Sequence, residues 1–87
     1  MQINYARKFV KVFSKAPVKI QPAFYDRLEI FAVDKFNPAL NNHKLAGKYN
    51  GYRSINISGD WRAIFREHEN KNLAFFYLIG THSELYK

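Results

Sequence analysis

The chain has 87 residues, 47% of them hydrophobic, which gives enough apolar surface for one folded core and too little length for two. The lack of cysteine excludes a disulfide framework, a thiolate nucleophile and a thiolate metal site, and it fits a reducing cytoplasm. The formal net charge of +7 favours a polyanionic partner, either a nucleic acid or an acidic protein. We therefore expect one domain over residues 1–87.

The first half of the chain predicts a short strand followed by a helical hairpin. Residues 2–5 favour a strand, and the apolar positions within residues 9–13 recur at helical spacing with lysines on the opposite face. Pro17 ends this helix or opens the next one. The apolar stripe of the second helix consists of Ile20, Phe24, Leu28 and Phe31. Pro22 leaves two possibilities open, a kink at this residue or a helix that begins near Gln21.

The second half predicts a long loop and then a sheet. Residues 37–51 are rich in Asn and Gly and favour a loop of the kind that often carries function. Strands are expected at residues 52–58, 61–67 and 73–79. In the first of them Ile55 and Ile57 face one side and polar residues the other, whereas the third is apolar on both faces, as in a central strand. Gly80 is expected to end the sheet and to leave residues 81–87 as a short tail that is polar apart from Leu85 and Tyr86.

These elements predict an α+β fold. It consists of a small antiparallel sheet, built from the N-terminal strand and a C-terminal three-stranded meander, with the two-helix hairpin packed on one face.

The side chains available for catalysis suit metal-free cleavage of RNA. No Gly-x-Ser-x-Gly elbow or phosphate-binding loop is present in the sequence, and the three histidines lack the spacing of a metal site. The remaining acid/base and cationic candidates are His43, Asp60, His82, Tyr86, Arg53 and Arg62. RNA is cleaved by its own 2′-hydroxyl when a base removes that proton, an acid protonates the leaving 5′-oxygen and cations stabilise the phosphate oxygens. Histidine titrates near neutral pH and suits either proton transfer.

Each candidate also has a purely structural interpretation. His43 lies in an Asn-rich loop where it can simply be exposed, and Asp60 occupies a turn position that favours aspartate on conformational grounds. His82 follows a strand end, where it can act as a cap. The two arginines can be solvated strand charges, and Tyr86 an edge ring with its hydroxyl in water. Composition and spacing leave these alternatives open.

Four motifs follow one another in the second half of the chain. They are His43-Lys44-Leu45-x-Gly47, Gly51-Tyr52-Arg53-Ser54, Gly59-Asp60-Trp61-Arg62 and Gly80-Thr81-His82-Ser83-x-Leu85-Tyr86. Together they resemble the C-terminal half of YafQ-like toxins of the RelE/ParE superfamily. The specific match covers residues 43–86, and the first half agrees only in its order of one strand and two helices. The resemblance implies a RelE-like fold and cleavage of mRNA in the ribosomal decoding site.

The resemblance also assigns roles to individual residues. The positions that it implies are catalytic are His43, Asp60, His82 and Tyr86. It also implies a phosphate contact for Arg62, and we expect Arg53, Lys44 and Asn56 to contact RNA as well. The chain departs from the family pattern at Ser54 and Asn56, because YafQ-like toxins often carry an acidic residue and a histidine on this strand. Asn56 can hydrogen-bond RNA but cannot carry a proton at neutral pH.

The leading hypothesis is a toxin of a type II toxin-antitoxin system that acts as a ribosome-dependent, metal-independent endoribonuclease on mRNA. Its expected partners are mRNA, the ribosome and a separate, usually acidic antitoxin, with no metal or cofactor. The first ten residues include charged side chains and fit neither a signal peptide nor a membrane span, so we expect a cytoplasmic protein without a membrane partner. Two alternatives stay open: a ParE-like toxin that poisons DNA gyrase, and a catalytically weakened relative that mainly binds its antitoxin.

Overall fold

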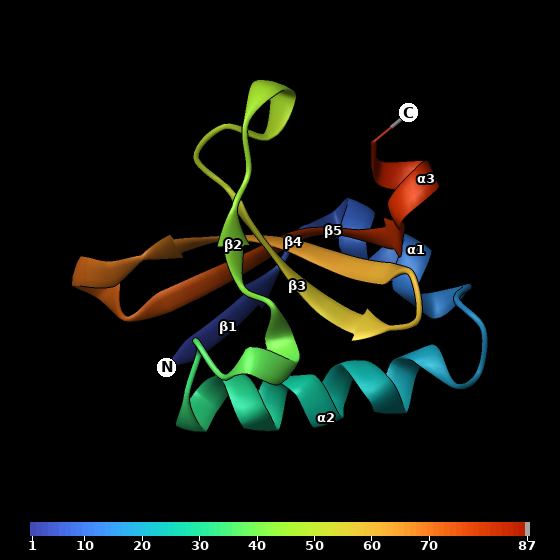
Figure 1. The fold of residues 1–87 in the computed structure, drawn as a ribbon, viewed down its shortest axis with the longest axis horizontal. Helices are drawn as coiled ribbons and strands as arrows, with labels where there is room; N and C mark the ends of the chain where they lie inside the picture. The colour runs from blue at the N-terminus through green and yellow to red at the C-terminus, as the bar shows by residue number, and fades with distance from the viewer. Residues whose placement is uncertain (87) are drawn as a thin grey trace.

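A computed structural model describes residues 1–86, and it shows one sheet with helices on both of its faces (Figure 1). The strands are β1 (Gln2–Tyr5), β2 (His43–Lys44), β3 (Arg53–Ser58), β4 (Trp61–His68) and β5 (Leu73–Thr81). The α-helices are α1 (Arg7–Ser14), α2 (Ile20–Val33) and α3 (His82–Leu85), and single turns of 3₁₀ helix occur at Pro38–Leu40, Gly47–Tyr49 and Glu69–Lys71. The predicted α+β class and the order of one strand, two helices and a meander are confirmed.

The five strands form a mixed sheet in the order β1-β5-β4-β3-β2. The meander β3-β4-β5 is antiparallel, as expected, and β2 is antiparallel to β3, but β1 runs parallel to β5, with Gln2 opposite Leu73 and Tyr5 opposite Phe76. The expectation of a wholly antiparallel sheet was therefore wrong at its edge. A tight turn between two strands forces them to be antiparallel, whereas β1 and β5 are separated by most of the chain, so no local signal fixes their relative direction.

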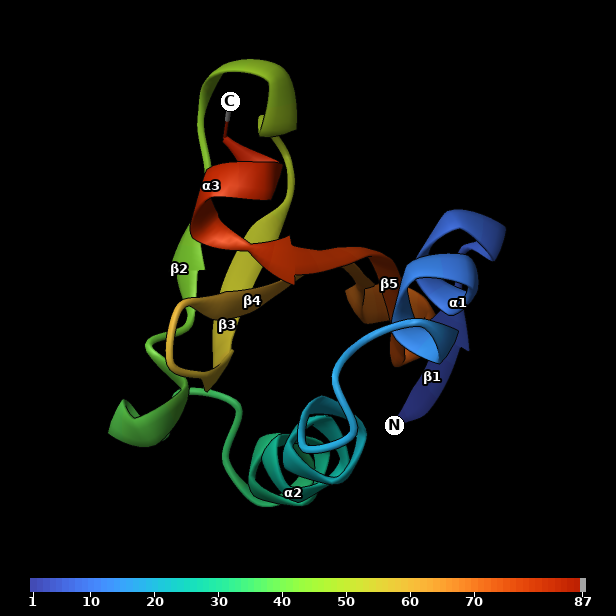
Figure 2. The same ribbon diagram turned by 90° about the vertical axis from the view of Figure 1, so that its right-hand side faces the viewer.

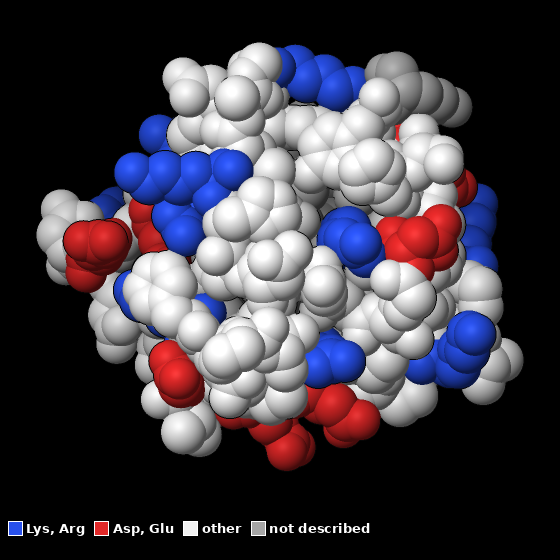
Figure 3. Space-filling view, viewed as in Figure 1, with Lys and Arg blue, Asp and Glu red and all other residues white. Residues whose placement is uncertain are grey.

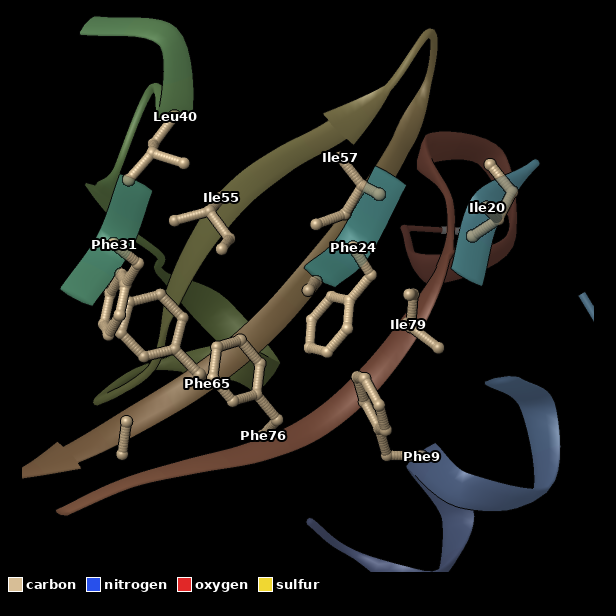
Figure 4. Packing of buried hydrophobic residues seen from close by; sticks show 12 residues of the cluster. Phe9, Ile20, Phe24, Phe31, Leu40, Ile55, Ile57, Phe65, Phe76 and Ile79 are labelled. Atoms are coloured by element: carbon tan, nitrogen blue, oxygen red, sulfur yellow. The ribbon is translucent and has the colours of Figure 1, made fainter. Parts of the chain in front are cut away.

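The main hydrophobic core lies between one face of the sheet and the helices α1 and α2 (Figure 4). Its fully buried members include Phe9 of α1, Phe24 of α2 and Phe76 of β5. The ring centroids of Phe9 and Phe24 are 5.3 Å apart, and those of Phe24 and Phe76 are 5.4 Å apart in an edge-on arrangement, the geometry that aromatic pairs prefer. The two helices therefore meet through aromatic side chains over the sheet, as the apolar stripes predicted.

The position of Pro22 settles how α2 begins. The helix starts at Ile20, so Pro22 is its third residue and lies in the first turn. Backbone N–H groups in a first turn have no partner within the helix, and proline therefore removes no hydrogen bond there. Of the two possibilities, a helix start near Gln21 is confirmed.

A second, smaller cluster covers the opposite face of the sheet. It contains Tyr49, Ile64 and Leu85, with Tyr77 and Leu78 packed against it. β5 reaches both clusters through a bulge, because Phe76 pairs with Phe65 and Leu78 pairs with Ile64, which leaves Tyr77 as an extra residue. The expectation that this strand is covered on both faces is confirmed.

Two elements of this second face were not expected from the sequence. Residues 81–87 were predicted to be a short tail, polar apart from Leu85 and Tyr86, yet α3 forms there and buries Leu85; Lys87 lies outside the described residues. The long loop contains β2, which pairs with β3 at the edge of the sheet. Figure 2 shows α3 and the loop that follows β2 on the side of the sheet away from α2.

Candidate active site

The face of the sheet opposite α1 and α2 carries most of the candidate residues. Alternation along β3 directs Ile55 and Ile57 into the main core and therefore turns Ser54 and Asn56 to the other side. Asn56 lies opposite Arg62 of β4, and Arg62 lies opposite Gly80 of β5. Arg62 shares its face with Ile64, a member of the second cluster. One surface thus contains the amide of Asn56 and the guanidinium of Arg62 side by side.

α3 places two further candidates beside this surface. The ring centroids of His82 and Tyr86 are 4.7 Å apart, and both side chains are exposed. The backbone N–H of His82 donates to the backbone oxygen of Asp60 at 2.8 Å, which ties the start of α3 to the turn between β3 and β4. His82, Tyr86, Asp60 and Arg62 therefore come together at one end of the sheet.

The local sequence explains why α3 forms there. Thr81 caps the helix: its hydroxyl accepts from the backbone N–H of Glu84, and the Glu84 carboxylate accepts from the backbone N–H of Thr81. Leu85 then anchors the helix in the second cluster. α3 packs closely over Gly80, where a Cβ atom would be in van der Waals contact with Glu84 and Leu85 at 3.4 Å.

Tyr49 fixes the far end of α3. Its hydroxyl donates to the backbone oxygen of Leu85 at 2.7 Å, and its ring lies edge-on to that of Tyr86 with centroids 5.7 Å apart. Burial raises the pKa of Tyr49, with a smaller rise from Tyr77 and an opposing effect from Lys8, so the phenol keeps the proton that it donates. The sequence analysis missed Tyr49, since no local signal marks a contact that spans 36 residues.

The Arg62 side chain is held at the β3–β4 turn. Its Nη1 donates to the backbone oxygens of Gly59 at 2.9 Å and Trp61 at 3.1 Å. Gly59 has a φ of 55°, which favours glycine in this two-residue turn. The guanidinium is thereby positioned, and within residues 1–86 its Nε and Nη2 donate no hydrogen bond, so these donors remain available to an anion.

Asp60 was expected to act through its side chain, but in this structure it contacts His82 through its backbone. Its contact with His82 is made by the backbone oxygen, and no hydrogen bond between the Asp60 carboxylate and a histidine ring is found among residues 1–86. The carboxylate is exposed at the turn. Asp60 thus positions the backbone of His82 in this structure, and orientation of an imidazole by its side chain stays a prediction.

His43 lies on the same face but at the opposite edge. It is exposed in β2, its Nδ1 is 2.7 Å from the backbone oxygen of Asn41, and it pairs with Ser54. This pairing makes His43 a diagonal neighbour of Asn56. β3 and β4 separate it from β5 and α3 (Figure 1), so the two histidines flank a shared surface and do not touch.

Arg53 and Lys44 lie on the other side of the sheet. Arg53 alternates with Ser54 and therefore faces the side of Ile55, and Lys44 is its partner in β2. The Nε of Arg53 donates to Oδ1 of Asn42 at 2.7 Å, and its guanidinium lies 5.3 Å from the ring centroid of Phe36. The structure therefore separates these two cations from Arg62 and His82.

Two buried polar atoms on the candidate face have no hydrogen-bond partner among the described residues. They are Oγ of Ser54, a residue with 0% exposure, and Oδ1 of Asn56. Leaving such a group unsatisfied costs about 1–3 kcal/mol, so these two positions lower the stability of the fold. Both atoms belong to the two positions at which the chain departs from the family pattern.

Two further features bear on the expectations. Within residues 1–86 no group of three His, Cys, Asp or Glu side chains is placed to hold a metal ion. Among the helices of that same stretch, none combines the length and the apolar character that crossing a bilayer requires.

Comparison with known proteins identifies the family. The family model for the YafQ toxin of bacterial type II toxin-antitoxin systems matches residues 1–87, while no curated protein sequence matches the chain. YafQ from E. coli has a TM-score of 0.73 at 23% identity, with coverage of 99% of this chain and 98% of that one. The E. coli DinJ-YafQ complex gives 0.71 at 24% identity, with coverage of 99% and 98%.

A YoeB/ParE toxin from Agrobacterium tumefaciens has a TM-score of 0.77 at 14% identity, with coverage of 94% of this chain and 99% of that one. Structural similarity at these sequence identities shows that the fold is shared. The match to the family model shows which family the chain belongs to. The chain belongs to the YafQ family of toxins from bacterial type II toxin-antitoxin systems.

Proposed function

We propose that this toxin is an endoribonuclease that cleaves mRNA on the ribosome in the cytoplasm and needs no metal ion. The observation that carries the proposal is the convergence of Arg62, His82 and Tyr86 at one end of a single sheet face, with Asn56 beside them. A guanidinium, an imidazole and an aromatic ring are the groups needed to hold a phosphate, move a proton and stack on a base.

The proposed reaction uses the ribose 2′-hydroxyl of the RNA as the nucleophile. Its oxygen forms a bond to the adjacent phosphorus, the bond from phosphorus to the 5′-oxygen breaks, and the products carry a 2′,3′-cyclic phosphate and a 5′-hydroxyl. One proton leaves the 2′-hydroxyl and one is delivered to the 5′-oxygen. Arg62 stabilises the charge on the phosphate oxygens, and Tyr86 positions a base.

His82 is the main proton-transfer group in this scheme, because it adjoins both Tyr86 and the turn that holds Arg62. His43 lies at the β2 edge, three strand spacings or roughly 14 Å from β5, so it binds the RNA backbone that flanks the cleaved bond, and solvent supplies the second proton transfer. Asn56 lies between the two histidines and hydrogen-bonds the strand that crosses the face.

The test is cleavage of mRNA on programmed ribosomes by single-histidine variants. His82→Ala is expected to lower the cleavage rate by about two orders of magnitude or more, the usual effect of losing an acid/base group, and His43→Ala by a smaller factor. His68→Ala is the matched control, because His68 is exposed at the far end of β4. A double variant of His43 and His82 that cleaves at the parent rate contradicts the proposal.

The weakened-relative alternative has one observation in its favour. Ser54 and Asn56 supply no proton-transfer group on β3. Under that alternative the wild-type protein forms a stable complex with its acidic antitoxin but leaves ribosome-bound mRNA intact, which the same assay detects.

A further inference from the structure

We propose that Lys44, Arg53 and Phe36 form a second RNA subsite, which binds a nucleotide that flanks the scissile bond. The inference rests on the proposed function, since it extends the path of the same RNA strand. It also assigns a role to Lys44 and Arg53, which lie apart from Arg62 and His82.

A concave site exists at this position. A cavity of about 360 Å³ is lined by Lys35, Phe36, Lys44, Tyr52 and Arg53, with Glu67 and Glu69 on one wall. Sites for small ligands have volumes of about 300–1,000 Å³, so this one has the size for a single nucleotide. In Figure 3 basic side chains gather over β2 with acidic ones beside them.

Three cations and two carboxylates line the cavity, which leaves it one net positive charge, and Lys44 and Arg53 are the cations outside its ion pair. Glu67 is neutralised by Lys35, with Nζ and Oε2 2.9 Å apart, whereas neither Lys44 nor Arg53 forms an ion pair with another residue of the described chain. Arg53 uses Nε to bind Asn42. This bond orients the guanidinium, and no hydrogen bond to its Nη1 or Nη2 is found within residues 1–86.

An exposed aromatic ring lies directly beside these cations. Phe36 is 57% exposed, and its ring centroid is 5.3 Å from the guanidinium carbon of Arg53 and 5.6 Å from Nζ of Lys35. Of these two cations only Arg53 has no ion pair, and an exposed aromatic ring next to such a cation is typical of single-strand nucleic-acid sites, where rings stack on bases and cations follow the phosphates.

The edge strand β2 lies between this subsite and the sheet face that carries Asn56 and Arg62. Successive residues of a strand face opposite sides, so His43 points to the face of Asn56 and Lys44 to the face of Arg53. Arg53 precedes Asn56 by three residues, roughly 10 Å along β3. An RNA strand that leaves the catalytic face past His43 therefore crosses β2 and reaches Lys44, Arg53 and Phe36.

Binding of RNA is tested separately from cleavage by using a fluorescein-labelled single strand with 2′-O-methyl riboses throughout, which lacks the attacking hydroxyl. Phe36→Ala is expected to weaken binding by roughly five-fold to a hundred-fold, the effect of losing one stacked base. Lys44→Ala is expected to reduce the slope of log K against log salt concentration by about 0.7, the contribution of one phosphate contact to a single strand. Arg53 is left intact because its contact with Asn42 also holds the loop.

The controls remove the same groups elsewhere. Tyr25→Ala deletes an aromatic ring that is 52% exposed on α2, and Lys19→Ala deletes an exposed lysine before that helix. Both variants are expected to bind within two-fold of the wild type with an unchanged salt slope. The inference is overturned if the wild type does not bind the oligonucleotide, or if the Phe36 and Lys44 variants behave like these controls.

The outcomes separate the subsite from the nuclease. If the two subsite variants lose affinity while the wild type leaves all mRNA intact, the subsite stands and the proposed nuclease activity does not. If the wild type cleaves mRNA and these variants bind and cleave normally, the nuclease stands and the subsite does not. Weakened binding of polyglutamate with unchanged RNA binding assigns the cavity to an acidic peptide and also overturns the proposal.

Discussion

At the scale of single residues, the most informative side chains are the buried polar ones on β3. Ser54 is fully buried without a hydrogen-bond partner for Oγ, although it lies in a row with Ile64 and Leu78, where an apolar side chain would pack without cost. Because the hydroxyl is fully buried it cannot contact RNA, so in this structure it lowers stability without adding a contact to the candidate face.

Ser54→Ala is therefore expected to stabilise the fold by about 1–2 kcal/mol, because the variant no longer buries an unsatisfied hydroxyl. Urea denaturation gives this change directly. Ser83→Ala, at an exposed position of α3, is the control and should shift the free energy of unfolding by no more than about 0.5 kcal/mol. Destabilisation by Ser54→Ala would mean that the hydroxyl has a partner in solution.

At the scale of elements, α3 is the part of the fold on which the proposed catalytic residues His82 and Tyr86 depend. Only four residues long, it is far too short to be stable alone. Its position comes from the Thr81–Glu84 capping box, the burial of Leu85 and the hydrogen bond from Tyr49. Any loss of these contacts should move His82 and Tyr86 together.

Tyr49→Phe tests this dependence without touching the proposed catalytic residues. It removes the donor to the Leu85 oxygen and is expected to cost about 0.5–1.5 kcal/mol of stability and to lower the cleavage rate. Hydrogen exchange should show faster exchange at the Tyr86 amide, whose N–H bonds the His82 oxygen. Tyr25→Phe is the matched control, and equal effects of the two variants would contradict the role given to Tyr49.

The same residue gives a pH dependence. Because the pKa of Tyr49 is raised in the folded state, its contribution to stability is fully present below about pH 10, the ordinary value for tyrosine, and is lost as the pH rises through the folded pKa. The difference in unfolding free energy between wild type and Tyr49→Phe should therefore be constant near neutral pH and shrink only in strongly alkaline buffer.

At the scale of the whole molecule, the question is which cellular process the toxin inhibits. The fold is shared with a YoeB/ParE toxin, so the fold alone does not separate a nuclease from a gyrase poison. The net charge of +7 suits either partner and an acidic antitoxin equally well. The arrangement of His82, Tyr86 and Arg62 is what favours the nuclease.

Induction of the protein in cells is expected to produce new transcript 5′ ends within translated regions, while plasmid supercoiling stays unchanged. Co-expression of an antitoxin should suppress both the cleavage and the growth arrest. Altered supercoiling with intact transcripts would support the ParE-like alternative. The His68→Ala variant should behave as the wild type, and His82→Ala should lose the new 5′ ends.

The sequence by itself determined the α+β class, the helical hairpin and the meander, because these follow from local hydrophobic periodicity and turn residues. It also pointed to His82, Arg62 and Tyr86. Only the tertiary structure decided the direction of β1, the formation of α3 and the separation of Arg53 from Arg62. Thr81 and Glu84 did carry a local signal for α3, but its docking depends on Tyr49, and contacts between residues distant in the chain leave no periodic trace in a single sequence.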